Sequence, residues 1–166
     1  NGDVYVAGNT SSLDFPTTIG TYDNSFSSDD VFISKFNEDL TSLLASTYLG
    51  GSDYDYGESV TIDSGGNIYV AGYTNSFDFP TTKNAYDTFL NDDASETDVF
   101  VSKLNSDLTN LLASTYLGGS SFESVVSIVI NSGGNIYIAG KTSSYDFPTT
   151  ASAYSTNGIG AFVSNF

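Results

Sequence analysis

The sequence lacks histidine, cysteine, methionine and tryptophan, and only four of its 166 residues are basic, all of them lysine. Without histidine or cysteine, the chain has neither the most common general base nor a thiol nucleophile, and it lacks the usual soft-metal ligands. Disulfide cross-links are excluded as well. Any reaction or metal site must therefore be built from carboxylates, hydroxyls and backbone groups.

Acidic residues number 20, so the formal net charge at pH 7 is −16. A chain of this charge repels phosphate backbones and anionic membranes, which excludes nucleic acid as a partner. No apolar run approaches the ~20 residues of a membrane-spanning helix, so we expect no membrane insertion. The absence of oxidisable sulfur fits an extracellular or cell-surface protein, and we expect that location.

The sequence repeats itself at long intervals. One segment occurs three times without a gap, as GDVYVAGNTSSLDFPTT (2–18), GNIYVAGYTNSFDFPTT (66–82) and GNIYIAGKTSSYDFPTT (134–150). A second segment occurs as VFISKFNEDLTSLLASTYLGG (31–51) and VFVSKLNSDLTNLLASTYLGG (99–119), and begins again as AFVSNF (161–166). Such self-similarity indicates a repeat architecture. We expect a single repeat domain over residues 1–166, with units 1–65, 66–133 and 134–166, of which the first and last are incomplete.

A full unit contains four predicted strands, at 58–63, 67–74, 99–105 and 111–118. Gly65 and Gly66 allow a tight hairpin between the first two, which should pair antiparallel. The strand at 67–74 carries apolar side chains on both faces, which indicates a sheet packed between two neighbouring sheets. The segment 107–114 lacks a sustained helical period, so we expect a turn followed by a strand.

The DFPTT element supplies one aromatic anchor per unit. Proline restricts the preceding residue to extended backbone, so each phenylalanine ring can be directed inward. We expect Asp14, Asp78 and Asp146 to cap the turn ahead of each ring. The anchors of the repeat are the Phe-Pro pairs and the turn glycines: Phe15, Pro16, Phe79, Pro80, Phe147, Pro148, Gly65, Gly66, Gly133 and Gly134.

The pattern G-N-I-Y-V-A-G-x-T-x-S-x-D-F-P-T-T, followed by V-F-V-S-K-L and S-T-Y-L-G-G, resembles the SBBP repeat, a family named for a seven-bladed β-propeller and found in large secreted and surface proteins. The resemblance covers essentially the whole chain. It implies an all-β architecture, an extracellular location and a scaffold role, with no general catalytic motif. Strand counts of three, four and three predict about two and a half four-stranded antiparallel blades in a β-propeller-like array, open rather than closed within this chain.

These features favour a non-catalytic extracellular structural or adhesive module that is a segment or subunit of a larger array or self-assembling surface filament. Uncovered strand edges and repeat ends recruit partners. We therefore expect other copies of the chain, or adjacent blades of a parent protein, to cover both ends. Two alternatives stay open: a calcium-stabilised carbohydrate-binding module with glycans as partners, and a glycan-active enzyme domain.

Calcium is the candidate ion, because hard cations prefer carboxylate and carbonyl oxygens on a loop. The richest loop spans residues 91–98, and its candidate ligands are Asp92, Asp93, Glu96 and Asp98. The alternative is an exposed acidic loop that keeps the protein soluble. We expect no other cofactor. A separate candidate modification site is Asn9, which opens an Asn-Thr-Ser sequon for N-glycosylation.

Carbohydrate chemistry would need two carboxyl groups at a set spacing. Asp53, Asp55 and Glu58 are the candidates, but the next unit does not repeat all three, so we expect solvated loop acids and no catalytic residue. Tyr54 and Tyr56 lie outside the strict repeat and are the candidate aromatic binding residues. The tyrosines that recur in register are expected in the core instead; they are Tyr5, Tyr69 and Tyr137.

Overall fold

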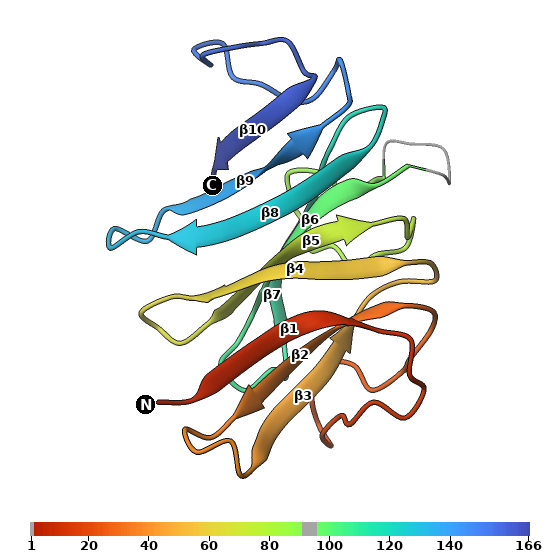
Figure 1. Ribbon diagram of the computed structural model, residues 1–166, viewed down its shortest axis with the longest axis vertical. Helices are drawn as coiled ribbons and strands as arrows, with labels where there is room; N and C mark the ends of the chain where they lie inside the picture. The colour runs from red at the N-terminus through yellow and green to blue at the C-terminus, as the bar shows by residue number, and fades with distance from the viewer. Residues whose placement is uncertain (1, 91–95) are drawn as a thin grey trace.

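The computed structural model describes residues 2–90 and 96–166, which form ten β-strands in three antiparallel sheets (Figure 1). Blade 1 contains β1 (Val4–Thr10), β2 (Asp30–Phe36) and β3 (Leu43–Leu49). Blade 2 contains β4 (Asp55–Ile62), β5 (Ile68–Thr74), β6 (Asp98–Leu104) and β7 (Leu111–Leu117). Blade 3 contains β8 (Glu123–Ile130), β9 (Ile136–Thr142) and β10 (Gly160–Asn165). None of the described residues belongs to a helix able to cross a membrane.

Within each blade, strands that follow one another in the chain are also neighbours in the sheet. This antiparallel meander is the strand order of a propeller blade. The predicted counts of three, four and three strands are confirmed, and no sheet closes on itself. The segment 107–114 is a turn that leads into β7, also as predicted.

The three blades lie one above another along the long axis of the molecule (Figure 1). One buried cluster joins blade 1 to blade 2 and includes Ile33 and Val70. A second cluster joins blade 2 to blade 3 and includes Val101 and Ile138. Val70 and its neighbour Ala71 point to opposite faces of β5 and belong to different clusters. Blade 2 is therefore covered on both faces, which explains its continuous apolar strands.

A short turn joins β4 to β5, the first two strands of blade 2. Gly66 has a φ of 83°, a conformation that glycine adopts at little cost. The Asp63 side chain stabilises the turn, because its Oδ1 accepts hydrogen bonds of 2.9 Å from the backbone N–H groups of Gly65 and Asn67. Gly65 itself does not need a positive φ.

The Phe-Pro element places one ring of each blade beside a ring of the sheet. Phe79 lies with its centroid 4.4 Å from that of Phe100, and Phe147 lies 4.6 Å from Phe162. Both Phe79 and Phe147 are buried. Phe15 makes the equivalent contact in blade 1 but is only partly buried. Pro16, Pro80 and Pro148 follow these rings in the β1–β2, β5–β6 and β9–β10 connections.

Candidate functional site

The repeated Leu-Gly-Gly-Ser segments are the linkers between successive blades. Residues 50–52 join β3 to β4, and carboxylates of blade 2 hold this linker. Asp55 Oδ2 accepts a 2.7 Å hydrogen bond from the Gly51 N–H. Asp78 Oδ1 accepts bonds from the Ser52 N–H, at 2.7 Å, and from the Ser52 hydroxyl, at 2.9 Å. These bonds hold the pKa of Asp78 below its usual value.

The second linker, residues 118–120, is held in the same way by blade 3. Glu123 Oε2 accepts a 2.9 Å hydrogen bond from the Gly119 N–H, and Asp146 Oδ1 accepts two bonds from Ser120. The expectation that Asp78 and Asp146 cap their own turns missed this second role, because their side chains reach back to the linker of the preceding blade. The repeated motifs thus build the junctions between blades.

A second acidic side chain meets each linker from the preceding blade. At the first junction Asp30 and Asp55 face each other across Gly50. A Cβ atom built on Gly50 would lie 2.2 Å from Asp30 Oδ1 and 2.8 Å from Asp55 Oδ2. Both carboxylates are almost completely buried, with 2% and 0% of their surface exposed. Burial raises the pKa of Asp55 to about 7, and the charge of Asp30 acts in the same direction.

This geometry corrects the expectation that Asp55 is a solvated loop acid. It begins β4 and is fully buried, because the strand starts directly beneath the linker. Asp53 is half-buried and Glu58 is exposed, so the three candidate carboxylates do not share one environment. The available signal was that Glu123, an acid too, occupies the position of Asp55 in the next unit.

The second junction contains the equivalent pair, Asp98 and Glu123. A Cβ atom built on Gly118 would lie 1.8 Å from Asp98 Oδ1 and 2.8 Å from Glu123 Oε2. Glu123 Oε1 also accepts hydrogen bonds from the hydroxyls of Thr142, at 2.5 Å, and Ser144, at 2.7 Å. The two junctions therefore share one design.

The proposed calcium ligands do not form one group among the described residues. Asp98 is buried at the junction, while Glu96 is only half-buried and its backbone carbonyl accepts a hydrogen bond from the Asn75 amide. Asp92 and Asp93 lie outside the described residues. Within residues 2–90 and 96–166, no group of three or more acidic side chains is arranged to hold a metal ion. Calcium binding by the 91–98 segment stays a prediction.

Asn9, the candidate glycosylation site, lies on β1 opposite Val31. Its side chain is exposed, so a glycan transferase could reach it. The structure places the sequon in a strand rather than in a loop. Glycosylation stays a prediction.

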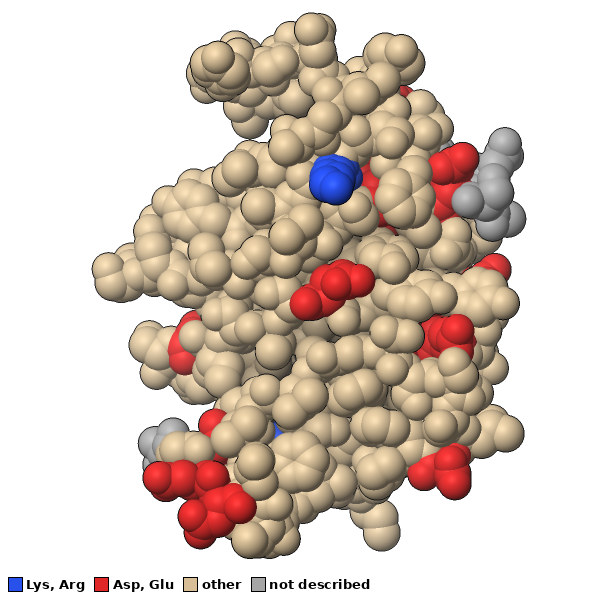
Figure 2. Space-filling model, in the orientation of Figure 1, with Lys and Arg blue, Asp and Glu red and all other residues tan. Residues whose placement is uncertain are grey.

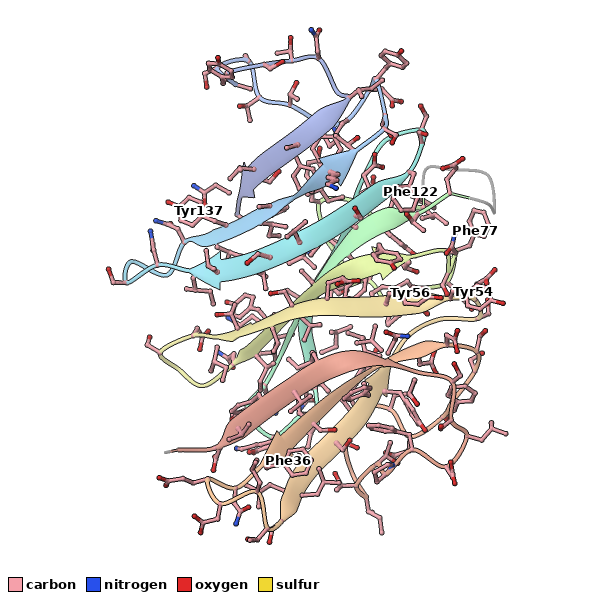
Figure 3. The ribbon with its side chains drawn as sticks, in the orientation of Figure 1. Phe36, Tyr54, Tyr56, Phe77, Phe122 and Tyr137 are labelled. Carbon is pink, nitrogen blue, oxygen red and sulfur yellow. The ribbon has the colours of Figure 1, made fainter. Side chains whose placement is uncertain are left out.

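Five aromatic side chains gather at one loop edge of the molecule, and Figure 3 labels four of them. Tyr56 stacks on Tyr73 with 4.9 Å between ring centroids, and the Tyr73 centroid lies 6.3 Å from that of Phe122. Tyr54, Phe77 and Phe122 are each about half exposed. Sequence reasoning singled out Tyr54 and Tyr56 but missed the other three, because they come from separate segments. We name these five side chains the aromatic edge.

The tyrosines that recur in register lie elsewhere. Tyr69 is buried between blades 2 and 3, beneath the ammonium group of Lys103 at 4.8 Å from the ring centroid. Tyr5 packs against the other buried cluster, with Lys35 over its ring. Tyr137 occupies the same position in blade 3 and is only partly buried.

Blade 1 and blade 3 each turn one apolar face outward. On blade 1 this face includes Val4 and Val6, and on blade 3 it includes Val163, which is 74% exposed. The view in Figure 2 shows acidic side chains mainly at the loop edges, with most of the remaining surface uncharged. The two outward faces lie at opposite ends of the stack of blades (Figure 1).

Comparison with protein families matches residues 46–80 to the SBBP model, described as a beta-propeller repeat. No curated protein matches the chain. The matched segment runs from β3 through the first linker, β4 and β5 to Pro80, so it spans the junction described above. The resemblance inferred from the motifs is thereby confirmed: the chain carries an SBBP β-propeller repeat within an open, all-β array of three blades.

Proposed function

We propose that this chain is a non-catalytic, extracellular structural or adhesive module whose end blades dock onto further blades, so that copies build a larger array or filament. One observation supports this role above the others. The outward face of blade 3 carries the repeat equivalents of the residues that blade 1 buries against blade 2. The outward face of blade 1 carries the equivalents of the residues that blade 2 buries against blade 1.

The equivalence can be followed residue by residue. At the first junction, Ile33 of blade 1 and Val70 of blade 2 belong to one buried cluster. The position of Ile33 is occupied by Val163 in blade 3, and the position of Val70 is occupied by Val6 in blade 1. Blade 3 of one copy, laid on blade 1 of the next, would therefore bring together the residue types that already pack inside the chain.

The contact would be heterologous, because the two faces differ. Heterologous contacts form rings when the rotation closes and filaments when it does not. A net charge of −16 opposes association of identical chains, and salt screens this repulsion over ~8 Å at physiological ionic strength. We expect assembly to strengthen as salt is added.

The first test is replacement of Val163 by aspartate, which should abolish assembly because a charge in a buried apolar interface is left unpaired. Wild-type protein is expected to form multimers in sedimentation velocity and chains of particles in negative-stain images, whereas V163D stays monomeric. V6D should also be monomeric, and a mixture of V6D and V163D should stop at dimers, since each keeps one intact face.

Leu112→Asp, at a half-exposed position of the middle blade, is the matched control and should assemble. Wild-type protein that stays monomeric at high concentration would contradict the proposal.

A second candidate function is glycan binding at the aromatic edge. Partly exposed rings offer sugars an apolar surface with polar groups nearby. Glu58 lies close enough to Tyr73 to raise the pKa of its hydroxyl further, after burial, and could accept hydrogen bonds from sugar hydroxyls.

Titration calorimetry with cello-, chito- and manno-oligosaccharides tests this second function. Phe122→Ala is expected to weaken binding several-fold and up to about tenfold, because an aromatic contact contributes roughly 0.5–1.5 kcal/mol. Tyr145→Ala, at an exposed position of blade 3, should bind like the wild type. Equal affinity of both variants would remove the aromatic edge from consideration.

A further inference from the structure

We propose that the Asp30–Asp55 pair holds one proton at neutral pH, so that the junction between blades 1 and 2 is an acid-stabilised contact. The proposal concerns the interior of one chain and does not depend on assembly. It assigns a proton-binding site to two residues that have no role in the scaffold function beyond holding the linker.

The first argument is geometric. The two carboxylates come from different blades and meet at Gly50, and nearly all of their surface is buried. Asp30 Oδ1 and Asp55 Oδ1 have no hydrogen-bond partner. Two ionised carboxylates in such a place would combine desolvation with mutual repulsion, and a shared proton relieves both.

The second argument is that no cation among the described residues acts on either carboxylate of the pair. The lysine ion pairs of the described residues go to Asp3 and Asp63 instead. The other titratable groups around the pair are acids and phenols that add negative charge or none. They are Asp23 and Asp29 beside Asp30, Tyr48 of β3, Tyr116 of β7, and Asp78 at the linker.

The third argument comes from the remaining hydrogen bonds. Asp55 Oδ2 accepts bonds from the Gly51 N–H and from the Ser76 hydroxyl, at 2.7 and 3.0 Å. Asp30 Oδ2 accepts one from the Ser27 N–H, at 2.9 Å. The Thr74 side chain is a further hydrogen-bond donor to Asp55. Asp30 Oδ1 and Asp55 Oδ1 stay without a partner, so a proton can occupy one of these oxygens without displacing a donor. Burial raises the pKa of both groups, that of Asp55 to about 7.

The direction of the pH effect follows from linkage. A carboxyl group with a higher pKa in the folded state binds its proton more tightly there, so the folded state gains stability in acid. This gain in folding stability is complete below pH ~4, which is the pKa of an aspartate in the unfolded chain. It is lost as the pH rises through about 7, the pKa of Asp55 in the folded chain. Asp63 has the opposite effect, because its pKa is lowered to about 2 and its protonation destabilises the folded chain. That loss occurs only below pH ~4, outside the range in which Asp55 titrates. From pH 5 to pH 8, the unfolding equilibrium constant should rise roughly a hundredfold through Asp55.

Urea unfolding of the full chain at pH 5 and pH 8, at constant ionic strength and with EDTA present, tests the proposal. Asp55→Asn should lose the roughly hundredfold part of the pH dependence that this pair contributes, because the amide is neutral at both values and can donate to Asp30. Asp30→Asn should behave alike and provides the test if the first variant does not fold. Glu58→Gln, at an exposed position of the same strand, should keep the wild-type dependence.

Three results would overturn the proposal. One is equal stability of the wild type at both pH values, and another is an unchanged pH dependence in Asp55→Asn and Asp30→Asn. The third is an increase in the stability of the wild type when calcium replaces EDTA at pH 8, with no such increase in Asp55→Asn. That result would mean that a cation neutralises the pair. If the chain did not assemble, the proton-binding proposal would still stand. Blade 3 carries Gly160 at the position of Asp30, so the outward faces used in assembly do not contain this pair.

Discussion

Replacing Gly72 with alanine is expected to destabilise the chain by about 4 kcal/mol, a large part of the ~5–15 kcal/mol that holds a folded domain together. A Cβ atom at this position would lie 1.8 Å from the Tyr56 carbonyl oxygen and 2.8 Å from the Phe100 ring. The carbonyl belongs to the backbone of β4, which shifts register beside Gly72 at residues 57–59. Relief of the clash would therefore require β4 to separate from β5.

The same substitution at Gly8 is the matched control. Gly8 has the same repeat position in blade 1, but β1 pairs only with β2, so no strand is hydrogen-bonded to its other edge. Gly57 of β4 packs near the Gly8 carbonyl, on a side that an added Cβ does not reach. The nearest atom to an added Cβ is on the Phe32 ring, at 3.1 Å. We expect a cost of at most ~1 kcal/mol in urea unfolding followed by circular dichroism. Equal costs at the two positions would contradict the strand arrangement.

The architecture could be predicted from the sequence because the signals for it are local. Alternating apolar residues in segments such as 67–74 indicate strands, and the Gly65-Gly66 turn fixes which strands pair. The meander joins neighbours in the chain, so the topology needs no long-range information. Repetition then supplies the strand count of each blade.

The junction chemistry could not be predicted because it depends on which blade covers which residue. Asp55 follows Asp53 and Tyr54 in a polar stretch, and only packing against Gly50 shows that it is buried. The role of Asp78 likewise appears only when the preceding linker is in place. The exchange of Asp55 for glutamate in the next unit was the one available clue, since it preserves a carboxylate while changing its length.

Replacement of Phe100 by alanine is expected to cost about 4 kcal/mol, because a fully buried ring leaves a cavity that the surroundings fill only partly. Its ring packs on Phe79 and belongs to the cluster between blades 1 and 2. Phe32 makes the same ring contact with Phe15 in blade 1, but it is only partly buried, because no further blade covers it within the chain. We expect Phe32→Ala to cost about half as much in urea unfolding.

This difference also bears on assembly, because docking of a second copy would bury Phe32 as blade 1 buries Phe100. The comparison should therefore be made in the V163D background, where the chain is expected to stay monomeric and the outward face of blade 1 uncovered. In the assembling protein the cost of Phe32→Ala should approach that of Phe100→Ala, and multimers should weaken at the same time. Equal costs of the two substitutions in the V163D monomer would mean that Phe32 is already covered, which would contradict an open face on blade 1.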